Sequence, residues 1–163
     1  MCQEYHKGQP CVYKPILCQE GYCSECDIYY QSLQPIRIGN RLRFDKPVHI
    51  LVVDDEPVIG QLFKASLNEH IYQVTTTLSS LEALELVGNR HFALIFIDLL
   101  MPELDGAELF RRIRQMDKNI PVAIITGYPD SDLMRRAMKC GPFTVMQKPF
   151  SSDDILNIAR SFV

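Results

Sequence analysis

The sequence has no long run of apolar residues. Although 47% of its 163 residues are hydrophobic, no stretch approaches the roughly 18 residues that a membrane-spanning helix needs. The first residues, Met1-Cys2-Gln3-Glu4-Tyr5-His6, also lack the basic and then apolar succession of a signal peptide. We therefore expect a soluble protein that stays in the cytoplasm and has no membrane partner.

Positive charge is in short supply. The 17 Lys and Arg residues are outnumbered by 20 Asp and Glu residues, which leaves a formal net charge of -3. This balance argues against a general affinity for nucleic acid. Charged residues make up 23% of the chain, a share typical of a folded globular protein. The length leaves room for one ordinary domain and a small appendage.

Cysteine is almost absent beyond residue 26. Five of the six cysteines fall within the first 26 residues, and Cys140 alone lies later. The two parts differ in composition, and Lys46-Pro47 precedes the first strong apolar run. We predict a Cys-rich module over residues 1–47 and a second domain over residues 48–163. Cys140, close to the expected end of a helix, is interpreted as a small core residue.

Residues 48–163 alternate between short apolar runs and segments of helical periodicity. Strands are expected at 48–53, 71–75, 91–97, 121–125 and 143–147, and helices follow them at 57–67, 79–87, 109–116, 131–139 and 151–162. Five strand–helix repeats favour an α/β fold. Each right-handed crossover has to cover the sheet, so this fold would be a doubly wound parallel sheet with helices on both faces.

Polar side chains follow four of the five predicted strands. Asp54-Asp55 comes after the first strand, Asp98 after the third, Thr126 after the fourth and Lys148 after the fifth. Taken singly, an acidic pair more often marks a polar loop, and a lone threonine a turn or a helix cap. Ligands of parallel sheets, however, bind beyond the carboxyl ends of the strands. The joint occurrence of these residues at strand ends therefore predicts one site.

The chemistry of this predicted site follows from its charges. Carboxylates of Asp54, Asp55 and Asp98 in one cleft repel one another unless a cation neutralises them, and hard oxygen ligands suit Mg²⁺. An aspartate can also accept a phosphoryl group as an acyl phosphate. Lys148 and the hydroxyl of Thr126 could then contact the phosphoryl oxygens. No His or Ser stands at these strand ends, which argues against an ordinary phosphatase.

At these residues the chain resembles the CheY-like receiver domain of two-component response regulators, over residues 48–163. The matching motifs are Asp54-Asp55, Asp-Leu-x-Met-Pro-x-x-Asp-Gly over residues 98–106, Thr126, and Lys-Pro-Phe over residues 148–150. The resemblance implies a five-stranded sheet of order 2-1-3-4-5, one of the common strand orders of doubly wound folds. It further implies a regulatory phosphoacceptor rather than an enzyme that turns over a metabolite.

The same resemblance assigns roles to individual residues. Asp98 would be the phosphoacceptor, and Mg²⁺ would be bound by Asp54, Asp55, Asp98 and the backbone carbonyl of Leu100. Thr126 and Lys148 would contact the phosphoryl group. A sensor histidine kinase or a phosphotransfer protein would supply that group. A downstream protein, whose identity the sequence does not reveal, would read the surface formed by the last two helices and the last strand.

Four residues distinguish this chain from the family pattern. Val145 stands three residues before Lys148, where the family usually has Tyr or Phe, so the usual aromatic switch is in doubt. Leu100 is apolar and cannot hydrogen-bond an attacking water, from which we predict slow self-dephosphorylation. Tyr128-Pro129, just after Thr126, predicts a stiff and crowded loop.

The N-terminal cysteines form a cluster of four thiols within 16 residues, Cys11-x6-Cys18-x4-Cys23-x2-Cys26, with Cys2 and His6 as further candidates. In a reducing cytoplasm such clusters more often bind metal than form disulfides. Zinc held by Cys11, Cys18, Cys23 and Cys26 is the first expectation. An iron–sulfur cluster is the alternative and would make this segment a metal or redox sensor coupled to the receiver. Reactive thiols and a simple lid over the receiver are also open.

Residues 36–44 alternate in the manner of a β-hairpin. A three-residue loop, Gly39-Asn40-Arg41, would place Ile36, Ile38, Leu42 and Phe44 on one face. We expect this hairpin to pack on the receiver or on the metal site.

Overall fold

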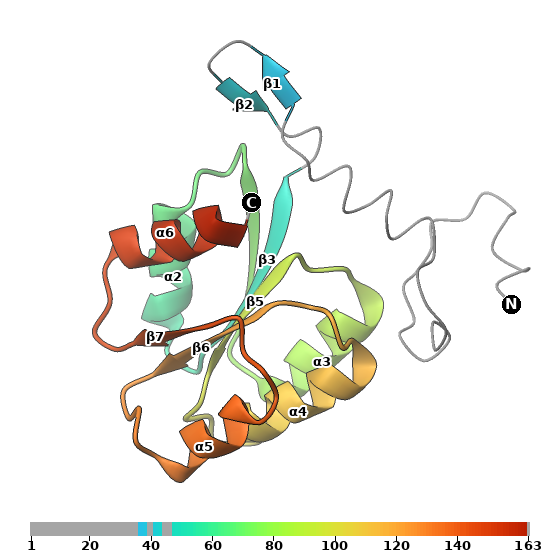
Figure 1. The fold of residues 1–163 in the computed structure, drawn as a ribbon, viewed down its shortest axis with the longest axis vertical. Helices are drawn as coiled ribbons and strands as arrows, with labels where there is room; N and C mark the ends of the chain where they lie inside the picture. The colour runs from blue at the N-terminus through green and yellow to red at the C-terminus, as the bar shows by residue number, and fades with distance from the viewer. Residues whose placement is uncertain (1–35, 39–40, 44–46, 163) are drawn as a thin grey trace, which may run out of the picture.

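The computed structural model describes residues 36–38, 41–43 and 47–162, and the fold is built around one parallel sheet. The strands of this sheet are β3 (Val48–Val53), β4 (Tyr72–Thr77), β5 (Leu94–Asp98), β6 (Val122–Thr126) and β7 (Thr144–Gln147). They lie in the order β4-β3-β5-β6-β7, and every neighbouring pair is parallel (Figure 1). This is the predicted order 2-1-3-4-5, which the structure confirms.

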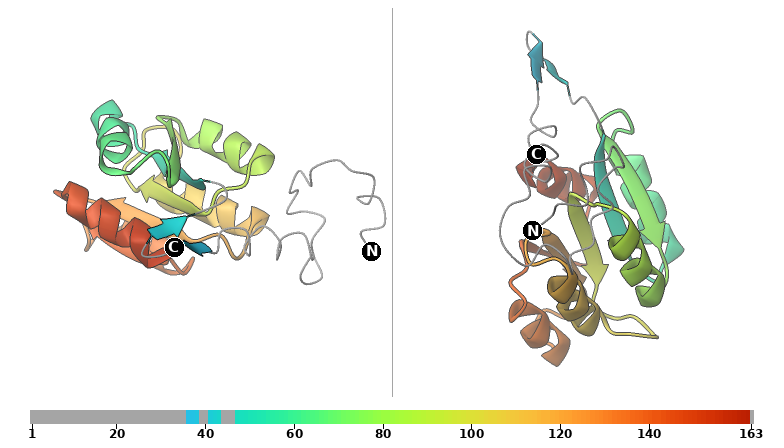
Figure 2. Two further views of the ribbon diagram at one scale, coloured as in Figure 1. Left: turned by 90° about the horizontal axis from the view of Figure 1, so that it is seen from above. Right: turned by 90° about the vertical axis from the view of Figure 1, so that its right-hand side faces the viewer.

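Helices cover both faces of the sheet (Figures 1 and 2). They are α2 (Pro57–Ser66), α3 (Ser80–Asn89), α4 (Gly106–Met116), α5 (Asp132–Met138) and α6 (Ser152–Phe162). Side chains alternate along a strand, so β3 sends Leu51 and Val53 into a core shared with α3, α4 and α5. Ile50 and Val52 point the other way, into a second core shared with α2 and α6. The doubly wound architecture is therefore confirmed.

The central strand is the most deeply buried. All five residues of β5 are buried, as are all five of β6. A strand with a helical layer on each side has no solvated face, which explains why these segments are continuously apolar up to their final residue. In each case that final residue is polar, namely Asp98 in β5 and Thr126 in β6.

Local capping explains where the helices begin. Pro57 occupies the first turn of α2, where its missing N–H costs nothing. The side chains of Ser79, Asp105 and Ser131 cap α3, α4 and α5 by accepting backbone hydrogen bonds. Just beyond α5, Gly141 takes a positive φ of 67°, a conformation that glycine adopts without strain.

Four predicted boundaries were wrong by two or three residues. Strand β4 runs to Thr77 and not to residue 75, and helix α4 begins at Gly106 and not at residue 109. Helix α3 runs to Asn89, past the expected stop at residue 87, and the Asn89 side chain donates a hydrogen bond to the Glu85 carbonyl at 2.9 Å. Strand β5 begins at Leu94 rather than at residue 91. The backbone N–H of Ala93 already donates a hydrogen bond to the carbonyl of His49, in β3, at 2.8 Å. The chain therefore contacts the neighbouring strand one residue before β5 begins.

The predicted hairpin exists, but its register differs from the expected one. Strands β1 (Ile36–Ile38) and β2 (Arg41–Arg43) are antiparallel, and Ile38 pairs with Arg41. The expected three-residue loop would have paired Ile38 with Leu42. The connection is instead two residues, Gly39-Asn40, a dipeptide typical of two-residue hairpins. Such a slip of one residue reverses which side chains share a face.

Among the helices that the structure describes, none is both long enough and apolar enough to cross a membrane. The boundary expected at residues 47–48 remains a prediction, since residues 44–46 lie outside the described part. The predicted cluster of Cys11, Cys18, Cys23 and Cys26, with Cys2 and His6, lies outside it as well.

Candidate functional site

Three carboxylates meet at the carboxyl edge of the sheet. Asp98 is the last residue of β5 and is 3% exposed, and Asp54 follows β3 and is 2% exposed. Asp55 is exposed beside them. One ligand oxygen from each of the three lies within 4.8 Å of the others. The strand-end pattern therefore predicted a real spatial cluster.

Lys148 brings a positive charge into this cluster from the end of β7. Its Nζ atom lies 3.0 Å from Asp54 Oδ2, 3.0 Å from Glu56 Oε1 and 3.3 Å from Asp98 Oδ1. The backbone N–H of Lys148 donates to the carbonyl of Thr126 at 2.8 Å, so β6 and β7 deliver their final polar residues together. The Lys148–Pro149 peptide bond that follows is cis.

Backbone amides orient the two buried carboxylates. The N–H of Leu100 donates to Asp98 Oδ2 at 3.0 Å, and the N–H of Glu56 donates to Asp54 Oδ1 at 2.9 Å. Each carboxylate is therefore held through one oxygen by the amide two residues later. The other oxygen, Oδ1 of Asp98 and Oδ2 of Asp54, faces the ammonium of Lys148.

The electrostatics of the site reflect this crowding. Burial and, after it, the charge of Asp54 raise the pKa of Asp98 to about 6, against the opposing effects of Lys148 and of the Leu100 amide. Burial also raises the pKa of Asp54. For Lys148, burial alone would lower the pKa, but hydrogen bonding and charge from Asp54, Glu56 and Asp98 outweigh it and raise the pKa. The ammonium stays charged, and the negative charges around it outnumber it.

The donor set fits a hard divalent cation. Oxygen ligands from three carboxylates, only one of them exposed, suit Mg²⁺. Asp54 Oδ2 is buried and receives no hydrogen bond of acceptable geometry from the described residues, although Lys148 lies within ion-pair distance. An oxygen in this situation has capacity for a cation that protein donors do not use.

Thr126 stands beside the carboxylates at the end of β6. It is 2% exposed, and its Oγ1 accepts a hydrogen bond from the N–H of Tyr128 at 3.0 Å. In the parallel pairing of β5 with β6, Asp98 stands opposite Ile125, so Thr126 lies one residue beyond it. Leu100 and Tyr128 flank this edge with exposed side chains. All strand-end residues predicted for the site are thus placed at one edge of the sheet.

The sequence analysis did not assign a role to two residues of this region, Glu56 and Gly106. Glu56, which contacts Lys148, is the third acidic residue in a row after β3, and that run was the available signal. Gly106 begins α4 against the backbone of β5. A Cβ atom at Gly106 would lie 2.0 Å from the carbonyl oxygen of Asp98. The Asp-Gly pair that ends the motif over residues 98–106 was a signal for a close backbone approach.

Two further positions singled out in the sequence are not strand-end residues. Val145, in the place expected for an aromatic switch, is 37% exposed on the edge strand β7. Cys140 is half-buried and packs against the core shared by α3, α4 and α5. The interpretation as a small core residue therefore holds only in part, because Cys140 packs against this core and is not fully buried.

Fold and site together define a class, the phosphoacceptor domains built on a five-stranded doubly wound sheet. Residues 50–160 match the family model of the response regulator receiver domain, and the chain belongs to this family. It is 32% identical over 114 residues to sporulation initiation phosphotransferase F of Bacillus subtilis, covering 70% of this chain and 92% of that protein. It is also 32% identical to the C4-dicarboxylate transport transcriptional regulatory protein DctD of Pseudomonas aeruginosa, of which it spans 25%.

Solved structures give the same assignment. The receiver domain of the Francisella response regulator 1452 is 30% identical and superposes with a TM-score of 0.64, over 72% of this chain and 96% of that one. The receiver domain of NtrX from Brucella abortus is 29% identical, with a TM-score of 0.63 over 69% of this chain and 96% of that one. A CheY-like receiver protein from Methanospirillum hungatei shares the fold, with a TM-score of 0.67 at 24% identity.

The chain is therefore homologous to phosphoacceptor response regulators of two-component systems. Receiver domains of this family use Mg²⁺ at their acidic pocket and interact with histidine kinases or phosphotransfer proteins. The chain spans about half of the response regulator MprA of Mycobacterium and about a quarter of DctD.

Proposed function

We propose that this protein is a response regulator that accepts a phosphoryl group on Asp98 from a sensor histidine kinase or a phosphotransfer protein. The observation that carries the proposal is the setting of Asp98. Its carboxylate is buried at the carboxyl edge of the sheet, with ligand oxygens of Asp54 and Asp55 within 4.8 Å and the ammonium of Lys148 at 3.3 Å. A regulatory phosphoacceptor needs this combination of nucleophile, cation ligands and fixed positive charge.

The transfer is a displacement at phosphorus. A carboxylate oxygen of Asp98 forms the new P–O bond while the P–N bond of a donor phosphohistidine breaks, and the leaving imidazole keeps the electron pair of that bond and takes up a proton. The amide of Leu100 holds Oδ2 of Asp98, which fixes the carboxylate plane. Oδ1 faces the cleft and Lys148, so it is the oxygen placed for attack.

Charge on the transferred group is balanced by residues from the other strand ends. Asp54, Asp55, Asp98 and the carbonyl of Leu100 would hold Mg²⁺, which supplies positive charge to the phosphoryl oxygens when bound. The ammonium of Lys148 supplies a second fixed charge. The hydroxyl of Thr126 would donate to a phosphoryl oxygen, because among the described residues its only side-chain hydrogen bond is the one that its oxygen accepts from Tyr128.

The signal leaves the domain by protein–protein interaction. We infer that a downstream protein reads the surface of α5, β7 and α6, where Met138 and Val145 are exposed. A kinase that draws on ATP acts in the cytoplasm, so the proposed function places the protein there.

Phosphorylation itself is tested with acetyl phosphate or a phosphorylated kinase as the donor, in the presence of Mg²⁺. Incorporation of about one phosphoryl group per chain is expected, and the linkage should be cleaved by hydroxylamine because an acyl phosphate is a mixed anhydride. Asp98→Asn should abolish labelling, whereas Asp153→Asn, an exposed aspartate in the first turn of α6, should leave it intact. Labelling that persists in Asp98→Asn would refute the assignment.

For the N-terminal segment we propose a zinc site made by Cys11, Cys18, Cys23 and Cys26. The support is the density of thiols in a segment too short to bury a core of its own. Protein purified without oxygen should contain about one zinc per chain and no visible absorption band. Iron with a broad visible band would replace this proposal by the alternative, a redox-sensing cluster.

A further inference from the structure

One ammonium group serves three carboxylates in the site. Lys148 Nζ lies 3.0 Å from Asp54 Oδ2, 3.0 Å from Glu56 Oε1 and 3.3 Å from Asp98 Oδ1. Among the described residues, the hydrogen bond of good geometry that this ammonium donates goes to Glu56 Oε1, and the contacts to Asp54 and Asp98 are ion-pair distances. A phosphoryl group on Asp98 takes the place of the Oδ1 contact, and Lys148 can turn toward its oxygens when the bond to Glu56 is given up.

The three carboxylates differ sharply in exposure. The side chains of Asp54 and Asp98 are 1% and 5% exposed, whereas that of Glu56 is 57% exposed. A buried carboxylate that loses its ion-pair partner is left as an unpaired charge out of contact with water, whereas an exposed carboxylate is hydrated instead. The contact to Glu56 is therefore the one that can be released at the smallest cost.

Glu56 nevertheless holds the ammonium in the resting site. Lys148 donates a hydrogen bond of good geometry to Glu56 Oε1 at 3.0 Å, whereas buried Asp54 Oδ2 receives none from the residues described. Glu56 is also the N-cap residue of α2, a position whose side chain commonly accepts from the helix amides. Its side chain makes no such capping bond and reaches Lys148 instead.

We propose that Glu56 is a positioning residue that retains Lys148 in the unphosphorylated site and releases it to a phosphoryl group on Asp98. The proposal rests on the function proposed above. Glu56 thereby opposes the phosphorylated state by the strength of a largely exposed ion pair. Loss of such a pair should shift the balance toward the phosphorylated state by about two- to fivefold.

Three variants distinguish the effect of the Glu56–Lys148 contact from the effect of the negative charge of Glu56. Glu56→Gln removes the charge, and Glu56→Asp keeps the charge but shortens the side chain by one methylene, so that it no longer reaches Lys148. Glu103→Gln is the matched control, because Glu103 is an exposed carboxylate in the loop after Asp98 that bonds to Ser79 and not to Lys148. If only the negative charge at position 56 mattered, Glu56→Asp would behave like the unsubstituted protein, because it keeps that charge.

The first readout is the side-chain ammonium resonance of Lys148 in metal-free protein, identified by its loss in Lys148→Gln. This resonance should shift in both Glu56 variants and stay in place in Glu103→Gln. With Mg²⁺ and beryllofluoride as the phosphoryl stand-in, all spectra should converge, because Glu56 is then released. A Lys148 resonance that ignores both Glu56 substitutions would overturn the proposal.

The second readout is the affinity for beryllofluoride at saturating Mg²⁺. Both Glu56 variants should bind it about two- to fivefold more tightly than the unsubstituted protein. Equal affinities, weaker binding in Glu56→Gln, or a Glu56→Asp variant that behaves as unsubstituted would each refute the role of Glu56. Failure of the unsubstituted protein to bind beryllofluoride would instead refute the proposed function and the release step with it, while the resonance in metal-free protein still reports the contact.

Discussion

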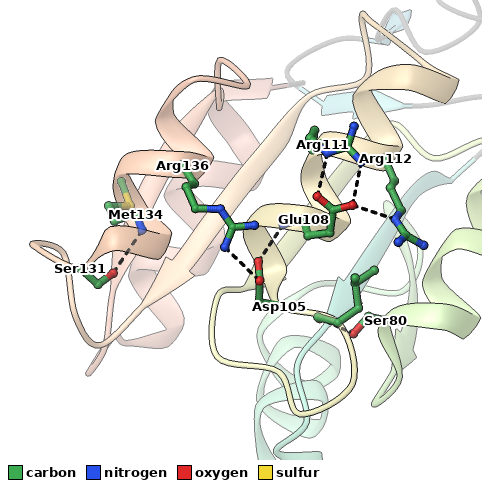
Figure 3. A network of polar contacts seen from close by, with 9 residues as sticks. Ser80, Asp105, Glu108, Arg111, Arg112, Ser131, Met134 and Arg136 are labelled. Atoms are coloured by element: carbon green, nitrogen blue, oxygen red, sulfur yellow. Dashed lines mark hydrogen bonds and ion pairs between the residues drawn. The ribbon is translucent and has the colours of Figure 1, made fainter.

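Arg136 and Asp105 join two helices next to the site. The Nη1 atom of Arg136, in α5, lies 3.0 Å from Oδ2 of Asp105, the residue that caps α4 (Figure 3). The other oxygen of Asp105 accepts the N–H of Glu108 at 2.8 Å. On its opposite side the same loop is bonded to α3, where Ser80 Oγ donates to the carbonyl of Leu104 at 2.7 Å. The loop that leaves Asp98 is thus braced between α3 and α5.

Asp105 both caps α4 and forms the ion pair, whereas Arg136 forms only the ion pair among the described residues. Substitution of Asp105 should therefore lower the free energy of unfolding more than substitution of Arg136. Asp105→Ala removes a helix cap and an ion pair and should destabilise the fold by about 1–2 kcal/mol. Arg136→Ala removes only a half-exposed pair and should cost about 0.2–1 kcal/mol. Urea unfolding of both variants and of the double variant gives the coupling energy. Arg135→Ala, which breaks a more exposed pair with Asp132, is the control. Equal costs for Asp105→Ala and Arg136→Ala would contradict the capping role.

Gly106 controls how closely α4 approaches the phosphoacceptor strand. A Cβ atom there would lie 2.0 Å from the carbonyl oxygen of Asp98 and 2.7 Å from Cα of Leu99, and backbone atoms cannot rotate away. Gly106→Ala should therefore destabilise the protein by about 1–3 kcal/mol, as overpacking does. It should also slow phosphorylation, since Asp98 has to move. Gly127→Ala, at a position with nothing within 4 Å of the added atom, should lower the unfolding free energy far less. A neutral Gly106→Ala would show that α4 shifts freely.

The sequence predicted what depends on local pattern. Short apolar runs that alternate with helical segments indicate strands buried on both faces, and polar residues at the ends of such strands meet at one edge of the sheet. Relations between distant side chains were not predictable. The contact of Glu56 with Lys148 depends on rotamers of residues 92 positions apart. The hairpin register depends on the turn, and alternation alone is compatible with either loop length.

The pKa of Asp98 makes stability depend on pH. Burial raises this pKa to about 6 in the folded protein from an ordinary value of 3.8, so the folded state holds the proton more tightly than the unfolded chain. Stability should consequently fall as the pH rises through this window, and the cost of ionising Asp98 should be complete above about pH 7. That cost is on the order of 2–3 kcal/mol.

Asp98→Asn removes the ionisation and keeps an oxygen that can accept from Leu100. In magnesium-free buffer this variant should be more stable than the unsubstituted protein at about pH 7.5 by on the order of 2–3 kcal/mol, and the difference should shrink toward about pH 4. Urea unfolding at several pH values measures it. Titrating groups that do not interact with Asp98 contribute equally to both proteins and cancel in the comparison. A difference that does not change with pH would mean that Asp98 titrates normally in the fold.

Leu100 should make the phosphorylated protein long-lived. Its side chain is 51% exposed directly after Asp98 and Leu99, and it offers no hydrogen bond to a water that attacks phosphorus. Leu100→Asn supplies such a bond while leaving the backbone amide that holds Asp98 in place. One added hydrogen bond of roughly 1 kcal/mol should speed dephosphorylation about fivefold. Loss of label after removal of the donor gives the rate.

Leu81→Asn is the matched control for this prediction. Leu81, at the start of α3, is also 51% exposed, so the two substitutions change exposed apolar surface to a similar extent, but Leu81 does not adjoin Asp98 in the chain. Leu81→Asn should leave the lifetime unchanged. A lifetime of seconds in the unsubstituted protein would contradict the prediction, because water would then be activated without position 100. Acceleration by both variants would assign the effect to general polarity, whereas acceleration by Leu100→Asn alone would show that the side chain at position 100 limits the attack.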